Sequence, residues 1–88
     1  MNLSRLRTQI DQVDQKLLRL LNRRARLALK IGEIKRRQGS PVFDGKRESD
    51  IVKRLNRMNR GPFPSAAVRQ IFRGIFRISR TLERSAGQ

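Results

Sequence analysis

The sequence contains no cysteine and no histidine. This absence excludes disulfides, thiolate nucleophiles, zinc sites built from cysteine and histidine, and catalytic pairs of serine or cysteine with histidine. The N-terminus lacks the apolar core of a secretory signal, and no apolar run approaches the roughly 20 residues that a membrane-spanning helix needs. We therefore expect a soluble, cytoplasmic protein without a metal site, whose chemistry depends on Arg, Lys, Asp, Glu and Ser.

Acidic residues are scarce, with 7 Asp and Glu against 22 Lys and Arg, so that the formal net charge is +15. Such a charge implies an anionic partner, which composition leaves open among nucleic acid, anionic lipid and small acidic metabolites. A basic helical dimer that binds nucleic acid is therefore one alternative. The chain has no Trp or Tyr for base stacking, and its cations are dispersed, so we expect any nucleic-acid binding to be non-specific.

Proline is absent from the first 40 residues, where apolar side chains recur at alternating spacings of three and four. This pattern predicts one helix over residues 3–38, about 54 Å long, which Gly39, Ser40 and Pro41 then end. Such a rod is longer than a globule of this size is wide. The stripe consists of Leu3, Leu6, Ile10, Val13, Leu17, Leu20, Arg24, Leu27, Ile31 and Ile34.

Two shorter helices are predicted after this break. Asp44 can cap a helix that runs to about Asn59, and Ser65 can cap one that runs to about Arg84. No strand pattern is present, so we expect a single all-α domain over residues 1–88. One such chain would leave half of the long helix uncovered. The sequence therefore predicts an intertwined homodimer in which two long helices pair antiparallel.

Arg24 is the one cation within the apolar stripe of the long helix. A buried guanidinium is costly unless an anion meets it, so Arg24 pairs either with a carboxylate, such as Asp14 or Glu83, or with an anionic ligand. Lys35 lies eleven residues further on, a net rotation of about 20° and about 16 Å along the axis, so both cations can face one cavity. Taken alone, Lys35 could equally be a solvated cation near the helix end.

Arg7 lies about 42 Å from Lys35 along the same helix and cannot reach that cavity within one chain. In an antiparallel dimer, Arg7 of the partner subunit would lie beside Arg24 and Lys35. Five other candidates follow on the two shorter helices, and each also has a structural interpretation. Asp44 could be a plain helix cap, Arg47 and Glu48 could be surface charges, and Ser79 could be a small residue that allows close helix approach. Glu83 could pair with Arg80 or Arg84.

The order and spacing of these residues resemble the all-α class of chorismate mutases, from about Leu3 to Glu83. The resemblance is carried by Leu6-Arg7, Ile10-Asp11, Asp14, Leu17-Leu18, Leu20-Leu21, Arg24, Ile31, Lys35, Pro41-Val42-Phe43-Asp44, Arg47-Glu48, Ile71-Phe72 and Ser79 to Glu83. It implies an intertwined homodimer with two sites, and an isomerase of aromatic amino acid biosynthesis, in the shikimate pathway. The enzyme would convert chorismate to prephenate by an intramolecular rearrangement that needs no cofactor.

The resemblance also implies a role for each candidate. Arg24 and Arg7 of the partner subunit would grip the two carboxylates of chorismate, and Lys35 would contact a carboxylate and the ether oxygen. Glu83, when protonated, would donate a hydrogen bond to that oxygen, which makes Lys35, Glu83 and Arg24 the candidate catalytic residues. The substrate hydroxyl would bind Glu48, Ser79 would touch a carboxylate, and the backbone near Asp44 and the side chain of Arg47 would line the pocket.

Two further alternatives share this fold. An isochorismate-pyruvate lyase would use nearly the same cations on a related substrate, so product analysis with both substrates is needed to separate the two activities. A regulatory subunit of the same fold would turn over slowly alone and faster with a partner enzyme.

Overall fold

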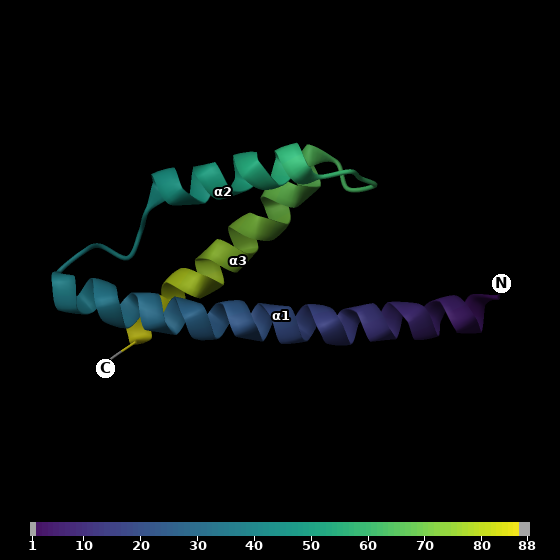
Figure 1. Cartoon of the computed structure of the whole chain (residues 1–88), viewed down its shortest axis with the longest axis horizontal. Coiled ribbons are helices and arrows are strands. Elements are labelled where there is room, and N and C mark those ends of the chain that lie inside the picture. The colour runs from purple at the N-terminus through teal and green to yellow at the C-terminus, as the bar shows by residue number, and fades with distance from the viewer. Residues whose placement is uncertain (1, 87–88) are drawn as a thin grey trace.

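The computed structural model describes residues 2–86 and contains three helices, α1 (Leu3–Gln38), α2 (Gly45–Met58) and α3 (Ser65–Ser85), without a strand in this range (Figure 1). These bounds confirm the all-α architecture and the one very long helix. Because α1 has 36 residues, it sets the longest dimension of a molecule that measures 55 × 27 × 15 Å. A single domain over 1–88 stays a prediction, since Met1, Gly87 and Gln88 lie outside the described residues.

Local capping explains most of the helix ends. The side chain of Asn2 accepts a hydrogen bond from the Arg5 amide at 2.8 Å, and α1 ends at Gly39, whose φ of 69° lies in the left-handed region that suits glycine. Asp44 caps α2 as predicted, accepting from the Arg47 amide at 3.0 Å. The prediction that Ser65 caps α3 is wrong, because the extended Pro64 takes the cap position and Ser65 is the first helical residue.

The helix α3 crosses the C-terminal half of α1 and carries α2 on its other side (Figure 1). The core of the single chain is therefore small, and its buried apolar residues are Ala28, Ile51, Val68, Phe76 and Ala86. On α1 the buried positions are Ala28 and Gly32, which lie beside the apolar stripe instead of within it. The stripe residues Leu27 and Ile31 remain 51% and 47% exposed in the single chain.

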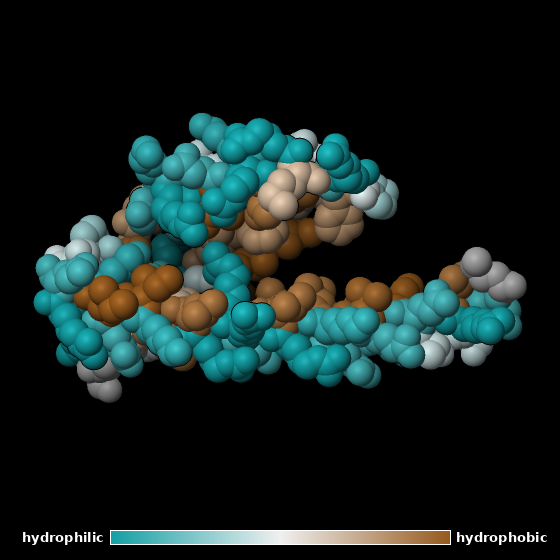
Figure 2. Space-filling view, in the orientation of Figure 1, coloured by the Kyte–Doolittle hydropathy of each residue, from teal (hydrophilic) through white to brown (hydrophobic). Residues whose placement is uncertain are grey.

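The N-terminal half of α1 has no intramolecular cover. Figure 2 shows apolar side chains in a row along α1, facing the open space beneath the overhanging α2 and α3. Each stripe residue from Leu3 to Leu20 is exposed, with Ile10 at 58% and Leu17 at 51%. This observation confirms that a lone chain leaves half of the long helix uncovered. No helix within residues 2–86 is both long enough and apolar enough to cross a bilayer.

Gly32 allows α1 and α3 to approach closely at their crossing. A Cβ atom at position 32 would lie 2.5 Å from the backbone oxygen of Glu83 and 2.7 Å from its Cα. Real Cβ atoms do not approach backbone this closely, so the absence of a side chain sets the distance between the two helices. The same contact places the backbone of Glu83 directly against α1.

Replacing Gly32 with alanine is therefore expected to lower the free energy of unfolding by about 1–3 kcal/mol, because the helix backbones must separate. Urea denaturation followed by circular dichroism measures the change. Gly74→Ala is the matched control, since an added Cβ would meet only the end of the Arg77 side chain at 4.0 Å. This control should be stabilised by up to about 1 kcal/mol through helix propensity. Equal effects of the two substitutions would contradict the close approach.

Candidate active site

A cavity of about 300 Å³ lies where the C-terminal half of α1, the start of α2 and the C-terminal half of α3 converge. Its wall is formed by Arg24, Ala28, Ile31, Lys35, Val42, Asp44, Arg47, Glu48, Ile51, Phe76, Ser79, Arg80 and Glu83. A volume of this size is at the lower end of the range for small-molecule sites. Seven of the eight residues that the sequence singled out line it. Arg7 is the exception, and it lies on the exposed N-terminal half of α1.

Arg24 enters the cavity as a half-buried cation without a carboxylate partner among residues 2–86. Its Nη1 donates a hydrogen bond to Ser79 Oγ at 2.7 Å, and its guanidinium carbon lies 5.6 Å from the centre of the Phe76 ring. Neither Asp14 nor Glu83 forms the ion pair that was the structural alternative. Two neutral groups thus hold the guanidinium in place, and its charge remains available to a ligand.

Lys35 is held from two directions. Its Nζ donates to the backbone oxygen of Val42 at 2.7 Å and lies 3.2 Å from Glu83 Oε1. The first contact connects the loop between α1 and α2 to the cavity wall. The second shows that Glu83 pairs with Lys35, and not with Arg80 or Arg84, which the sequence offered as partners. The side chains of Lys35 and Glu83 are only 22% and 10% exposed, so this ion pair is well shielded from solvent. The ammonium and the carboxylate therefore line the same cavity as a pair.

Elsewhere on the cavity wall, Glu48 forms an ion pair with Arg80, whose guanidinium also lies 5.4 Å from the centre of the Phe43 ring. The sequence interpretation missed Arg80 as a site residue and considered it only as a partner of Glu83. Its spacing of four from Phe76, on the inner edge of α3, is the signal that could have placed it in the cavity. Phe76 itself was assigned only to the apolar face.

Asp44 and Arg47 lie at the mouth of the cavity, at the N-terminus of α2. Asp44 is both the predicted helix cap and a lining residue, so its structural and functional interpretations are compatible. Arg47 forms no ion pair within residues 2–86. The wall thus carries four cations and three carboxylates, and two ion pairs leave Arg24 and Arg47 as unpaired cations. Because Asp44 is also outside these ion pairs, the net surplus is one positive charge, and the two guanidinium groups without a carboxylate partner suit an anionic ligand.

The fold and the cavity together define an all-α domain whose three helices enclose a cavity rich in charged side chains. A sequence model of the family described as chorismate mutase type II matches residues 6–84. The chain belongs to this family.

Individual relatives agree with this assignment. The bifunctional chorismate mutase/prephenate dehydratase of Aquifex aeolicus is 41% identical over 86 residues, which cover 93% of this chain and 24% of that protein. The chain therefore spans about a quarter of the length of such relatives. A chorismate mutase structure from Thermus thermophilus superposes with a TM-score of 0.93 at 39% identity, with 97% of each chain covered.

A structure of chorismate mutase from Helicobacter pylori in complex with prephenate also superposes well. It has a TM-score of 0.88 and 37% sequence identity, and the match covers 96% of this chain and 91% of that one. At these identities the likeness extends beyond the fold to the family.

Proposed function

We propose that this chain is a chorismate mutase, which converts chorismate to prephenate. The observation that carries the proposal is Arg24, a half-buried guanidinium that donates to Ser79 and lies over the Phe76 ring. It forms no ion pair within residues 2–86 and lines a cavity with further cations. A shielded cation of this kind is stabilised when a carboxylate of the ligand meets it. Prephenate, the product of the proposed reaction, is the molecule in complex with the related Helicobacter pylori enzyme.

The cavity chemistry is suited to a reaction of this type. The rearrangement is intramolecular and needs neither a nucleophile nor an obligatory proton transfer. Catalysis then has two tasks, which are to hold a flexible dianion in its reactive conformer and to stabilise the negative charge that develops on the ether oxygen. Arg24 performs the first task in this proposal. Lys35 performs the second, and Glu83, which lies beside it on the cavity wall, assists as a hydrogen-bond donor when it is protonated.

The proposal includes a homodimer in which Arg7 acts in the site of the partner subunit. It is supported by the exposed apolar stripe on the N-terminal half of α1, because an uncovered row of leucine, isoleucine and valine needs a partner surface (Figure 2). An antiparallel second α1 would bury this row and bring a second guanidinium to each cavity. A cytoplasmic location stays a prediction from the sequence.

A spectrophotometric assay of chorismate loss by the purified chain tests the proposal. The expected result is conversion to prephenate, identified by chromatography, with no release of pyruvate when isochorismate is offered in a parallel assay. Pyruvate release without prephenate formation would instead assign the isochorismate-pyruvate lyase activity. No turnover of either substrate would contradict an enzymatic role for the isolated chain.

Glu83 provides a prediction on kcat. In the proposed role Glu83 donates a hydrogen bond to the ether oxygen, which an ionised carboxylate cannot do. Glu83→Gln supplies an amide donor and also removes the ion pair that engages Lys35. We therefore expect kcat of this variant to equal or exceed that of the wild type. The matched control is Glu33→Gln, an exposed carboxylate on α1, which should keep the wild-type kcat. Loss of most of the activity in Glu83→Gln would exclude Glu83 from this role.

A further inference from the structure

Arg80 is a cation of the cavity wall to which no role is assigned above. It lies on α3, its Nη1 donates to Glu48 Oε2, and the two side chains are only 23% and 22% exposed. Its guanidinium also lies over the Phe43 ring. Because a guanidinium is planar, it can stack on a ring with its face while it donates hydrogen bonds from its edge. Arg80 is thus held by the loop before α2 and by α2 itself.

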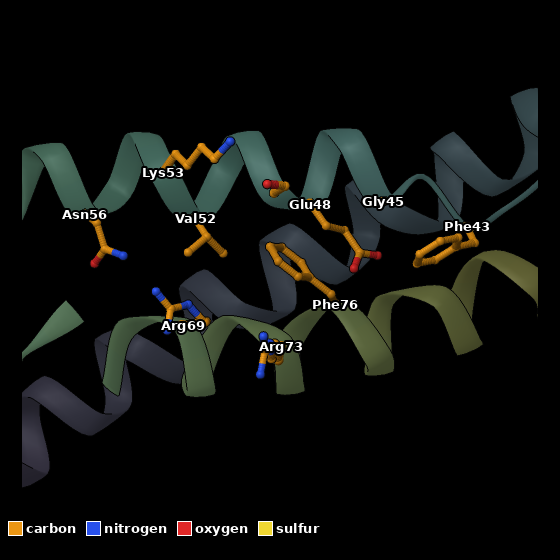
Figure 3. A pocket seen from close by; sticks show the side chains of 10 residues that line it. Phe43, Gly45, Glu48, Val52, Lys53, Asn56, Arg69, Arg73 and Phe76 are labelled. Atoms are coloured by element: carbon orange, nitrogen blue, oxygen red, sulfur yellow. The ribbon is translucent and has the colours of Figure 1, made fainter. Parts of the chain in front are cut away.

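Glu48 lies between two cavities. A second cavity of about 340 Å³ occupies the groove between α2 and α3, and Glu48 and Phe76 line both spaces. Figure 3 shows this second cavity, with the Glu48 side chain extending from α2 toward Phe43 and with Arg69 and Arg73 on the facing helix α3. These two arginines form no ion pair within residues 2–86. The second cavity is therefore also electropositive, and it competes with the candidate active site for the Glu48 carboxylate.

Arg80 lines only the first cavity, the candidate active site. Its ion pair therefore biases the Glu48 carboxylate toward that side. A free glutamate side chain samples several rotamers, and fixing it costs up to about 2 kcal/mol of side-chain entropy. The contact with Arg80 already fixes the Glu48 rotamer in the free protein, so ligand binding does not have to lose this side-chain entropy. Glu48 Oε1 receives no hydrogen bond from any residue in the described range, so one oxygen remains to accept a proton donor of the ligand.

We propose that Arg80 is a positioning residue, which holds the Glu48 carboxylate in the active-site cavity with Oε2 occupied and Oε1 free to accept the hydroxyl of the substrate. The proposal rests on the mutase function proposed above. In this role Arg80 acts through Glu48 and does not grip a substrate carboxylate, because its own charge is already paired. Phe43 keeps the guanidinium in the orientation that this ion pair requires.

A double-mutant cycle on kcat/KM for chorismate tests this coupling. Arg80→Ala alone should lower kcat/KM by about 10- to 100-fold, the cost of a misplaced site group. In a Glu48→Ala background, the same substitution should change kcat/KM by less than about 2-fold, because the group that Arg80 positions is gone. Arg80→Lys, which keeps the charge without the planar face, should fall between wild type and Arg80→Ala. Equal losses in the two backgrounds would overturn the proposal.

Two further measurements separate the possible failures. Arg77→Ala, an exposed arginine on the same helix, should retain wild-type kcat/KM, and the melting temperature of every variant shows whether lost activity reflects lost folding. A crystal structure of Arg80→Ala should show the Glu48 carboxylate turned toward the second cavity or spread over several rotamers. A carboxylate that keeps its wild-type position would refute positioning by Arg80 whether or not the chain is active. An inactive wild-type chain would refute the mutase function instead.

Discussion

Replacing Arg24 with alanine is expected to reduce kcat/KM for chorismate by about 1,000-fold or more, below the detection limit of a spectrophotometric assay. Arg24 is the only cation of the cavity that is both shielded from solvent and free of a carboxylate within residues 2–86. Its removal leaves a ligand carboxylate in a water-poor cavity without its principal counter-charge. Such an unpaired group costs several kcal/mol relative to the paired state.

The fold should survive this substitution. Arg24 contributes a hydrogen bond to Ser79 and a stacking contact with Phe76, which together are worth about 1–2 kcal/mol, and its removal also eliminates a half-buried charge. Gel filtration and thermal denaturation should therefore match the wild type closely. Arg23→Ala, at the adjacent exposed position, is the control for charge alone and should keep most of the activity. Retention of most of the rate in Arg24→Ala would contradict the assignment of the site.

Mixed dimers of two inactive variants are expected to recover activity. Arg7 and Lys35 lie on the same α1 about 42 Å apart, so they serve different sites if the dimer is antiparallel. A dimer of one Arg7→Ala chain and one Lys35→Ala chain has one site with both substitutions and one site with neither. Co-expression with two affinity tags, followed by purification on both, should yield about half of the wild-type activity per dimer.

The control for this experiment is a mixed dimer of Arg24→Ala and Lys35→Ala chains. Both residues line the cavity of their own chain, so each site of the mixed dimer carries one substitution and no activity should return. Recovery in both mixtures would indicate reversion or contaminating wild-type protein. Absence of recovery in the Arg7 mixture would argue against a site shared between subunits.

Local rules explain why much of this structure was predictable. The bounds of α1 follow from its apolar spacing and from Gly39, whose left-handed backbone requires no tertiary information. Helical rotation likewise placed Lys35 in register with Arg24, because an α-helix is rigid enough for angles to hold over eleven residues. The candidate residues at the start of α2 and on α3 were singled out by their places on these helices, and the family resemblance gave them roles. The cavity brings them to these two cations.

Tertiary packing explains what the sequence did not reveal. Apolar periodicity indicates the stripe of α1, but within the chain α3 packs on the neighbouring face, where Gly32 permits backbone contact with Glu83. A glycine inside a predicted helix does not indicate which other helix will pack against it. Arg80 was missed as a site residue for a similar reason, since its ion pair with Glu48 joins residues that are 32 positions apart.

A crystal structure of the chain in complex with prephenate is the most direct test of a dianion enclosed by two crossed subunits. The expected result is an antiparallel dimer in which each prephenate contacts Arg24 and Lys35 of one chain and Arg7 of the other. Prephenate bound by a single chain, with the apolar stripe of α1 exposed to solvent, would contradict the account. So would a cavity that keeps its internal ion pairs and excludes the ligand.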